Sequence, residues 1–308
     1  MREVRFSISL PQLVHDDHAE LVRGYAPRAE ELGFTGLWTL DSAVGGRTAH
    51  NPLLDGLHLL TYAASLTRRA ALGIAVIVLP RRNPALLAKE LATVDQLSGG
   101  RLAVGVGLGM SDGSEGALGF PTDRHPRRLR ENVEVMRALW TQEEATYEGE
   151  IYRFAGVRVH PKPFRRTLPI WFGAGQPRAL RRAARLADGW IGSGSSASSD
   201  FVTQSKILRE ELEAAGRDPG TFPIAKRVYI AVEDDERRAT EKLAPILDGM
   251  YGRPGMTEAV ALRGPADQCA EQLQPLIEAG AGELLLNPMY EPLEQLEAVA
   301  EVRRLALG

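Results

Sequence analysis

Short apolar runs alternate with amphipathic stretches along the chain. Several runs are apolar at every position, as in residues 75–79, which is typical of strands buried on both faces of a parallel sheet. The stretches between them have helical spacing, so we expect strands joined by crossover helices. The eight predicted strands are Val4–Leu10, Gly36–Leu40, Leu72–Leu79, Leu102–Gly107, Ile170–Gly173, Gly189–Gly192, Ile224–Val232 and Glu283–Asn287.

Two of the helical stretches carry a start signal. Asn51-Pro52 and Asn83-Pro84 each place a capping asparagine before a proline at the first helical position. Four stretches present an apolar face at helical spacing. These faces are Leu53, Leu57, Leu60 and Ala64; Leu87, Leu91, Val94 and Leu97; Leu129, Val133, Met136 and Trp140; and Cys269, Leu273, Leu276 and Ile277, with Gly280 as a C-terminal cap.

Two segments interrupt the alternation. Residues 146–159 have the pattern of an inserted hairpin, and residues 234–263 are charged and then rich in glycine and proline. We expect the second segment to be a mobile insertion that serves as a lid or a subunit contact. No internal boundary or repeat is visible, so residues 1–308 are predicted to form a single domain.

Eight strand–helix units without a second domain favour an α/β fold of the closed (β/α)8 type, a TIM barrel with insertions, over an open doubly wound sheet. A length of 308 residues suits such a barrel. In a closed barrel, the functional residues lie at the C-terminal ends of the strands and in the loops that follow. These loops are therefore where chemistry is expected.

Composition narrows the class of protein. A net charge of −3 gives no general attraction to nucleic acid or to an anionic membrane. Cys269 is the only cysteine, which excludes an intrachain disulfide, and its place on an apolar helix face indicates a core residue. Residues 1–10 lack the apolar core of a signal peptide, and no later run is long enough to span a bilayer. We therefore expect a cytoplasmic protein.

The second and third predicted strands end in polar groups. Asp41 can accept hydrogen bonds from a cofactor or a neighbour, or it can equally cap a loop. Arg81 and Arg82 follow the third strand, where two arginines can hold a phosphate or carboxylate. Their charge alone favours a solvated loop.

The fourth strand ends in the glycine-rich sequence Gly105-Val106-Gly107-Leu108-Gly109-Met110. Met110 occupies the position where a dinucleotide-binding fingerprint needs glycine. We therefore interpret Gly107 and Gly109 as positions where the backbone approaches a flat ligand closely.

The fifth strand leads through Gly173, Ala174, Gly175 and Gln176 into a helix over residues 178–187. Small residues before a helix N-terminus expose backbone N–H groups, which makes this loop a predicted phosphate cradle. In the first turn Arg178 could approach an anion, whereas the later arginines of this helix are predicted to be solvated. A second loop rich in hydroxyl and amide groups, with Ser193 and Gly194, follows the sixth strand.

Other chemistries lack their motifs. There is no G-x-S-x-G elbow, H-E-x-x-H helix, cysteine pair or phosphate-binding loop of the G-x-x-x-x-G-K-[ST] type. His15 and His18 are the one close pair with ligand-like spacing, and a single pair is weak support for a metal. No metal site is predicted.

Taken together, the strand ends resemble the bacterial luciferase-like family of flavin- and F420-dependent oxidoreductases, over roughly the whole chain. The resemblance rests on the order and spacing of Glu31–Asp41, Leu79–Lys89, Leu97–Gly107, Pro161–Pro163, Pro169–Gly175 and Ala183–Trp190.

The resemblance implies a barrel with insertions that holds a flavin or deazaflavin at its mouth. It places a non-proline cis peptide at Ala75-Val76, against the ring, and the phosphate at residues 173–176, with Ser193 and Gly194 nearby. It favours coenzyme F420 with hydride transfer to or from a small organic molecule. The alternative is an FMN-dependent monooxygenase, supplied by a flavin reductase. A homodimer is also implied.

The chain departs from the F420-dependent sugar-phosphate dehydrogenases of this family. They have histidine at the position of Ser42 and glutamate at the position of Met110. A serine cannot replace histidine as a base near neutral pH. Asp41, Ser42 and Met110 are therefore expected to line the ring without an assigned proton-transfer role. A non-catalytic flavin-binding protein is a further alternative, while a metal-dependent barrel lyase or hydrolase would need acidic clusters that the strand ends lack.

Overall fold

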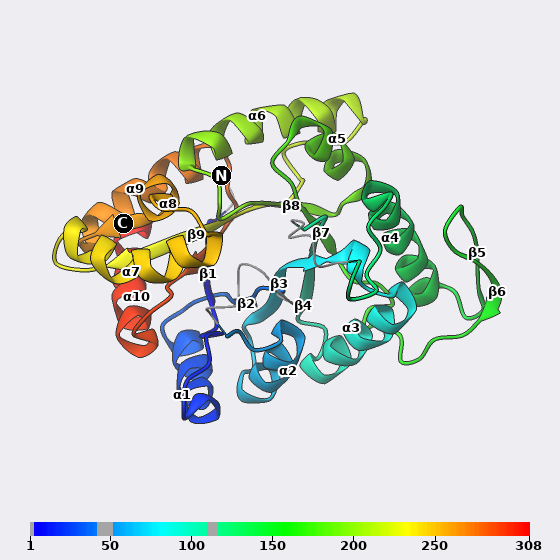
Figure 1. The fold of residues 1–308 in the computed structure, drawn as a ribbon, viewed down its shortest axis with the longest axis horizontal. Coiled ribbons are helices and arrows are strands. Elements are labelled where there is room, and N and C mark those ends of the chain that lie inside the picture. The colour runs from blue at the N-terminus through cyan, green and yellow to red at the C-terminus, as the bar shows by residue number, and fades with distance from the viewer. Residues whose placement is uncertain (1–2, 42–51, 110–115) are drawn as a thin grey trace.

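The computed structural model describes residues 3–41, 52–109 and 116–308. Eight parallel strands close into a barrel, in the order β1-β2-β3-β4-β7-β8-β9-β11, with β11 paired back to β1 (Figure 1). The predicted TIM barrel is therefore confirmed, and each predicted strand is present to within one residue at either end. The barrel strands are β1 (Arg5–Ser9), β2 (Gly36–Thr39), β3 (Ala71–Val78), β4 (Leu102–Gly107), β7 (Ile170–Gly173), β8 (Gly189–Gly192), β9 (Ile224–Val232) and β11 (Glu283–Asn287).

An outer ring of helices covers the barrel (Figure 1). Each helix packs its apolar face against the strands, which are almost fully buried. The ring consists of α1 (His18–Glu31), α2 (Gly56–Leu66), α3 (Pro84–Ser98), α4 (His125–Thr141), α5 (Pro177–Leu186), α6 (Ser198–Ala214), α9 (Ala266–Glu278) and α10 (Pro292–Leu307). A short 3-10 turn, η2 (Leu79–Arg81), follows β3. In the described part of the chain, no helix is both long and apolar enough to cross a membrane.

One of the two predicted helix starts is correct. Asn83 caps α3, accepting hydrogen bonds from the backbone N–H groups of Ala85 (3.0 Å) and Leu86 (3.2 Å). The start at Asn51-Pro52 is wrong, because α2 begins at Gly56 with Asp55 as its cap. Residues 52–54 are extended instead, since their backbone pairs with residues 12–14.

The predicted apolar faces are buried apart from Leu97, Leu53 and the half-buried Ile277. Leu97 has an exposed fraction of 65%, so the face of α3 ends one turn earlier than expected. Leu53 lies outside α2 and lines the mouth of the barrel. Cys269 is fully buried on α9, as expected of a core residue, and Gly280 follows the end of that helix at φ +93°.

The seam between β1 and β11 contains a buried carboxylate. Glu283 is 4% exposed and accepts hydrogen bonds from Arg5 Nη2 (2.7 Å), Ser7 Oγ (2.7 Å) and Trp38 Nε1 (3.2 Å). Three donors on β1 and β2 thus meet one acceptor from the last strand. A buried charge with this number of partners ties the two ends of the sheet together.

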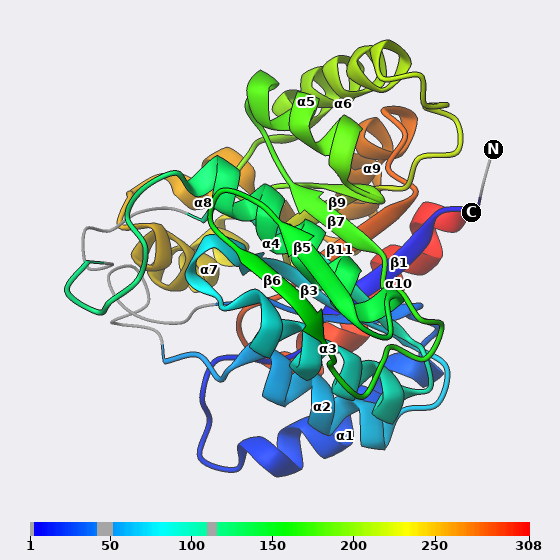
Figure 2. The same cartoon turned by 90° about the vertical axis from the view of Figure 1, so that its right-hand side faces the viewer.

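Segment 146–159 contains the antiparallel pair β5 (Ala145–Glu148) and β6 (Arg153–Val157). Figure 2 shows this hairpin in front of α4, to which the buried Glu131 connects it. The Glu131 carboxylate accepts hydrogen bonds from the backbone N–H groups of residues 150, 151 and 152.

Segment 234–263 is largely helical. It contains α7 (Glu236–Tyr251) and α8 (Met256–Val260) and runs into the short strand β10 (Leu262–Gly264), which pairs with β9. These helices pack in a separate apolar cluster against Tyr229 and Ala231, in the C-terminal half of β9. The insertion thereby brings Met250 and Tyr251 to the mouth of the barrel.

Candidate active site

A cavity of about 870 Å³ lies at the C-terminal ends of the strands. This is where a barrel presents its functional loops, and the volume suits a cofactor-sized ligand. Every described residue that the sequence predicted as cofactor-binding lines it, whereas Ser42 and Met110 lie outside the described residues. These lining residues are Asp41, Ala75, Val76, Gly107, Gly109, Gly173, Ala174, Gly175, Gln176, Ser193 and Gly194.

The floor of the cavity is shaped by an irregularity in β3. The Ala75-Val76 peptide is cis, as predicted, and the pairing of β3 with β4 shifts between Ile74 and Ile77. The shift turns Val76 toward the strands beside it. A methyl group added at Gly107 or at Gly173 would lie 2.9 Å from a Val76 methyl, so both positions need glycine to seat this side chain.

This contact revises the interpretation of the two glycines at the end of β4 and just after it, Gly107 and Gly109. Gly107 lines the cavity, but its lack of a side chain is required by Val76 rather than by a ligand alone. Gly109 has a φ of +72°, a conformation that favours glycine. A side chain there would also collide with Val78, at 2.4 Å from its Cγ1.

Asp41 connects the end of β2 to the end of β3. Its carboxylate accepts hydrogen bonds from the backbone N–H of Val78 (3.0 Å) and from Arg82 Nη2 (2.6 Å), and its side chain is only 2% exposed. Arg82 is therefore held inside by an ion pair, and the prediction of a solvated loop is wrong for this residue. Burial opposes the charge of Arg82, but Asp41 outweighs it, so the pKa of Arg82 is raised.

The loop between β7 and α5 exposes donors to the cavity. Gln176 precedes α5 without a side-chain cap. Pro177 has no N–H and the Ala179 N–H donates to the Gln176 carbonyl oxygen (2.8 Å), which leaves the Arg178 N–H without a capping side chain. Gly175 lies beside Gln204 of α6: a methyl group added there would be 3.2 Å from the Gln204 amide nitrogen. The buried Gln204 Oε1 has no hydrogen-bond partner within the described ranges.

The cation that α5 presents to this cavity is Arg182. Its half-buried side chain lines the cavity, and burial lowers its pKa. Arg178, which the sequence suggested for an anion, is exposed and does not line the cavity. The expectation of a solvated face is thus wrong for Arg182, whose side chain is half-buried at the cavity.

Lys226 of β9 anchors the loop after β8 through hydrogen bonds. This lysine is 3% exposed, and its Nζ donates hydrogen bonds to the carbonyl oxygens of Ser193 and Ser196 (2.8 Å for Ser196) and to the Ser196 hydroxyl (3.1 Å). Burial lowers the pKa of Lys226 to about 7, against the attraction of Asp200. Sequence reasoning missed this residue, although a lysine inside an apolar strand was a visible signal.

The side of the mouth that lies across from β3 carries Arg227 and two tyrosines. Arg227 Nη1 donates to the Ala75 carbonyl oxygen (3.1 Å), and its guanidinium lies 5.2 Å from the ring centre of Tyr229. The hydroxyl groups of Tyr229 and Tyr251 are 2.9 Å apart. Arg227 and Tyr229 also escaped prediction, although their spacing of two puts them on the same face of β9.

The histidine pair does not form a chelating arrangement. The rings of His15 and His18 stack with centres 5.9 Å apart at 22°. Burial and then the neighbouring His15 lower the pKa of His18. In the ranges 3–41, 52–109 and 116–308, no group of three or more His, Cys, Asp or Glu side chains could hold a metal ion.

Similar proteins use both types of cofactor that the sequence suggested. An F420-dependent glucose-6-phosphate dehydrogenase of Kineococcus radiotolerans is 34% identical over 222 residues, covering 70% of this chain and 65% of that protein. An FMNH2-dependent dimethylsulfone monooxygenase of Pseudomonas putida is 34% identical over 177 residues, covering 56% and 48%.

Solved structures share the fold. An F420-dependent secondary alcohol dehydrogenase, in complex with an F420-acetone adduct, superimposes with a TM-score of 0.85 over 99% of both chains, at 20% identity. The family model of luciferase-like monooxygenases matches residues 4–283, nearly the whole barrel. Together with the closed barrel and its cavity, this match shows that the chain belongs to the luciferase-like monooxygenase family.

Proposed function

We propose that this protein is an oxidoreductase that uses coenzyme F420 to transfer a hydride to or from a small organic substrate. The observation that carries the proposal is the cavity of about 870 Å³, which is lined both by Ala75-Val76, the irregular segment of β3 (the β3 bulge), and by Gly175-Gln176, the loop before α5. A flat ring with a phosphate-bearing tail needs an apolar surface for the ring and N–H donors for the phosphate. Both are available in the one cavity.

The residues fit such a group in two places. Ala75 and Val76 offer the apolar face for the ring, while Gly175 and Gln176 offer backbone N–H groups beside Ser193. Arg182 adds a cation that can balance a phosphate charge. When bound, F420 would accept or donate the hydride, and the protein would position it against the substrate.

The remaining residues of the mouth fix geometry and exclude water. Asp41 and Arg82 anchor the end of β3, and Lys226 anchors the loop that carries Ser193. Met250 and Tyr251, brought in by the insertion, line the cavity and are proposed to limit its access to water. An enclosed mouth would protect a reactive intermediate from water.

The preference for F420 over FMN rests on the resemblance to the F420-dependent branch, including the glucose-6-phosphate dehydrogenase relative. The second candidate is an FMNH2-dependent monooxygenase, supported by the dimethylsulfone monooxygenase relative. In that case a flavin reductase would be the partner that supplies reduced FMN. In either case we propose a cytoplasmic homodimer. Light scattering after size-exclusion chromatography would test whether the protein is dimeric.

Cofactor titration tests the assignment. Purified protein is titrated with F420 and with FMN, and binding is followed by fluorescence. We expect F420 to bind more tightly than FMN; tight FMN binding without F420 binding would move the protein to the second candidate. Binding of neither would reject the proposal.

The phosphate loop is tested by Gly175→Leu. A leucine beside Gln204 fills the space over the N-terminus of α5, so cofactor affinity should fall by about tenfold or more, equivalent to roughly 1.4 kcal/mol. Gly24→Leu is the matched control, because Gly24 is exposed on α1 with no atom within 4 Å of an added methyl. Equal affinity of the two variants would reject this phosphate site.

A further inference from the structure

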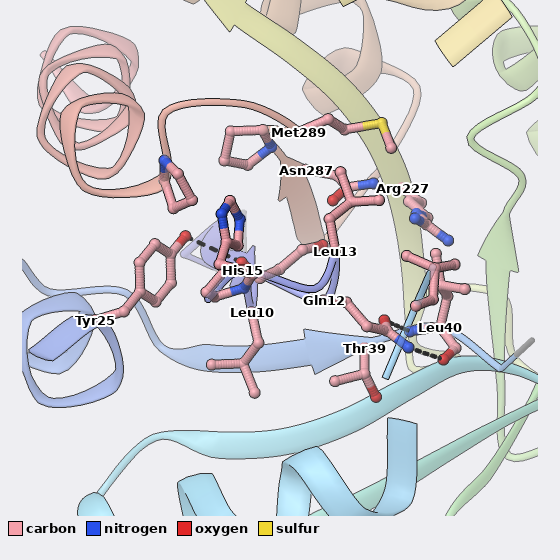
Figure 3. A pocket seen from close by; sticks show the side chains of 15 residues that line it. Leu10, Gln12, Leu13, His15, Tyr25, Thr39, Leu40, Arg227, Asn287 and Met289 are labelled. Carbon is pink, nitrogen blue, oxygen red and sulfur yellow. Dashed lines mark hydrogen bonds between the residues drawn. The ribbon is translucent and has the colours of Figure 1, made fainter. Parts of the chain in front are cut away.

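A small side pocket opens beside the main cavity, between the ends of β1, β2, β9 and β11 (Figure 3). Its volume is about 40 Å³, and it shares Leu40, Leu53 and Arg227 with the main cavity. One water needs roughly 10–15 Å³ by this kind of measure, so the pocket has room for about three waters. That is also the number of heavy atoms in a carboxylate.

Two polar side chains of this pocket are already fully used. Gln12 donates to the carbonyl oxygens of Leu40 (2.8 Å) and Leu54 (2.7 Å) and accepts from the Leu40 N–H (2.9 Å). The Tyr25 hydroxyl donates to the Ser9 carbonyl oxygen (3.0 Å). These hydrogen bonds are dashed in Figure 3 where both partners are drawn. They hold Gln12 and Tyr25 in place in the pocket wall and use every side-chain donor of these two residues.

Two other side chains retain unused donors. Asn287 is 6% exposed, and its Nδ2 has no hydrogen-bond partner in the described part of the chain. The Nε of Arg227 is likewise buried without a partner, while Nη1 is taken by Ala75. Both side chains line the side pocket, Arg227 from β9 and Asn287 from the end of the paired strand β11 (Figure 3). A buried donor without an acceptor is unfavourable, so each of these groups suggests an acceptor supplied by a ligand.

The charge of Arg227 specifies the kind of acceptor. Within residues 3–41, 52–109 and 116–308, Arg227 contacts the Ala75 carbonyl oxygen and the Tyr229 ring, and no carboxylate pairs with it. Arg82, at the same mouth, is by contrast neutralised by Asp41. A guanidinium presents its donors in a planar fork that matches a carboxylate, and Asn287 adds a further N–H beside it.

We propose that Arg227 and Asn287 bind the carboxylate of a small carboxylic acid that is the substrate. The redox role of this acid rests on the proposed function, whereas its binding does not. Leu13 and Met289 line the pocket around the carboxylate, and Leu53 leads from it into the main cavity. Because Arg227 also holds the Ala75 carbonyl oxygen, the acid would be positioned directly beside the β3 bulge.

The test uses a matched pair of fluorinated probes, 4,4,4-trifluorobutanoate and 4,4,4-trifluorobutanamide, which differ in the charged group. Binding to the cofactor-free protein is followed by fluorine NMR at pH 7.5 and repeated with F420 present. We expect the carboxylate to bind at least about tenfold more tightly than the amide. Arg227→Met should remove this preference, and Asn287→Leu should reduce carboxylate affinity about threefold.

Arg153→Met is the control for loss of positive charge, because the Arg153 side chain is 74% exposed on the remote hairpin β5–β6. The Arg153→Met variant should bind the carboxylate probe as tightly as the wild type. Should Arg227→Met fail to fold, Arg227→Lys replaces it, and a loss of about fivefold is expected since lysine lacks the planar fork.

Equal binding of the two probes by the wild type, or wild-type carboxylate affinity in the Arg227 variants, would overturn the proposal. Carboxylate binding without cofactor binding would reject the proposed function and keep this subsite. Cofactor binding without any preference for the carboxylate would do the reverse.

Discussion

Asp41 lines the cavity at the end of β2, where its side chain could contact a cofactor or stabilise the fold. Its two oxygens are both engaged by Val78 and Arg82, and the side chain is nearly inaccessible. The immediate role that the contacts support is therefore the anchoring of β3. Any effect of Asp41 on the ring would act through that anchoring.

Asp41→Ala should lower the free energy of unfolding by about 2 kcal/mol, because it leaves the half-buried Arg82 without its counterion and the Val78 N–H without its acceptor. Urea denaturation measures this loss. Asp123→Ala is the control. Its ion pairs with Arg124 and Arg128 involve a carboxylate that is 56% exposed, so its loss should change stability far less. Similar losses in the two variants would contradict the anchoring role.

Lys226 should make stability depend on pH above neutrality. Its pKa is about 7 in the folded protein and about 10.5 when unfolded, so between these values the unfolded chain holds the proton more strongly. The cost of burying the charge is fully present below pH 7 and is relieved as pH rises. The free energy of unfolding should thus gain up to about 1.4 kcal/mol per pH unit from this one group.

Lys226→Met removes the titrating group. Urea denaturation of both proteins at pH 7, 8 and 9 should show that the wild type gains stability relative to the variant as pH increases. Parallel pH profiles would show that Lys226 does not titrate in this range.

The glycine and serine positions of the mouth were predictable because they follow strands whose order is clear from the sequence. Lys226, Arg227 and Asn287 were not predicted, since they lie within strands whose apolar residues dominate the pattern. Their importance depends on which strands become neighbours in the closed barrel. Arg227, for example, contacts Ala75 from a strand 152 positions later.

Among the elements, the insertion α7–α8 differs most from its expected form. Its charged and then glycine- and proline-containing sequence predicted a mobile insertion, whereas the segment is largely helical. Asp248 organises the turn between the two helices by accepting hydrogen bonds from the N–H groups of Gly255 and Thr257 (both 2.8 Å). The cap of α2 was missed for a related reason. Asn51-Pro52 has a good local signal, but pairing with residues 12–14 keeps the segment that follows extended.

Tyr251 connects this insertion to the mouth. Tyr251→Ala should open the cavity to solvent, raising iodide quenching of the bound cofactor's fluorescence by about twofold, because the side chain that lines the opening is removed. Tyr251→Phe is the matched control: it loses only the hydroxyl contact with Tyr229 and should be quenched like the wild type. Unchanged quenching in the alanine variant would show that α7 does not shield the site.

The overall fold can be predicted from the sequence more directly than the arrangement of the candidate site can. Eight apolar runs separated by amphipathic stretches form a regular pattern along the whole chain. Runs that are apolar at every position are typical of strands buried on both faces of a parallel sheet. The closure of the sheet and its order were therefore predictable. The seating of Val76 between Gly107 and Gly173 was not, because it depends on packing between strands.

Cys269 offers a probe of global unfolding. It is fully buried and burial raises its pKa to about 12, so almost no thiolate is present or accessible at pH 8. A chromogenic disulfide reagent should therefore leave the folded protein unlabelled and should react with one equivalent after denaturation. Rapid stoichiometric labelling under native conditions would indicate that α9 opens locally.

The seam at Glu283 has a consequence for biosynthesis. Ser7 and its acceptor are 276 positions apart, and a ribosome adds about 5–20 residues per second. For tens of seconds, then, the nascent chain carries β1 with one edge unpaired and apolar surface exposed, a state that is prone to aggregate. Chaperone supply and growth temperature should accordingly govern how much folded protein a cell accumulates, even where the finished barrel is stable.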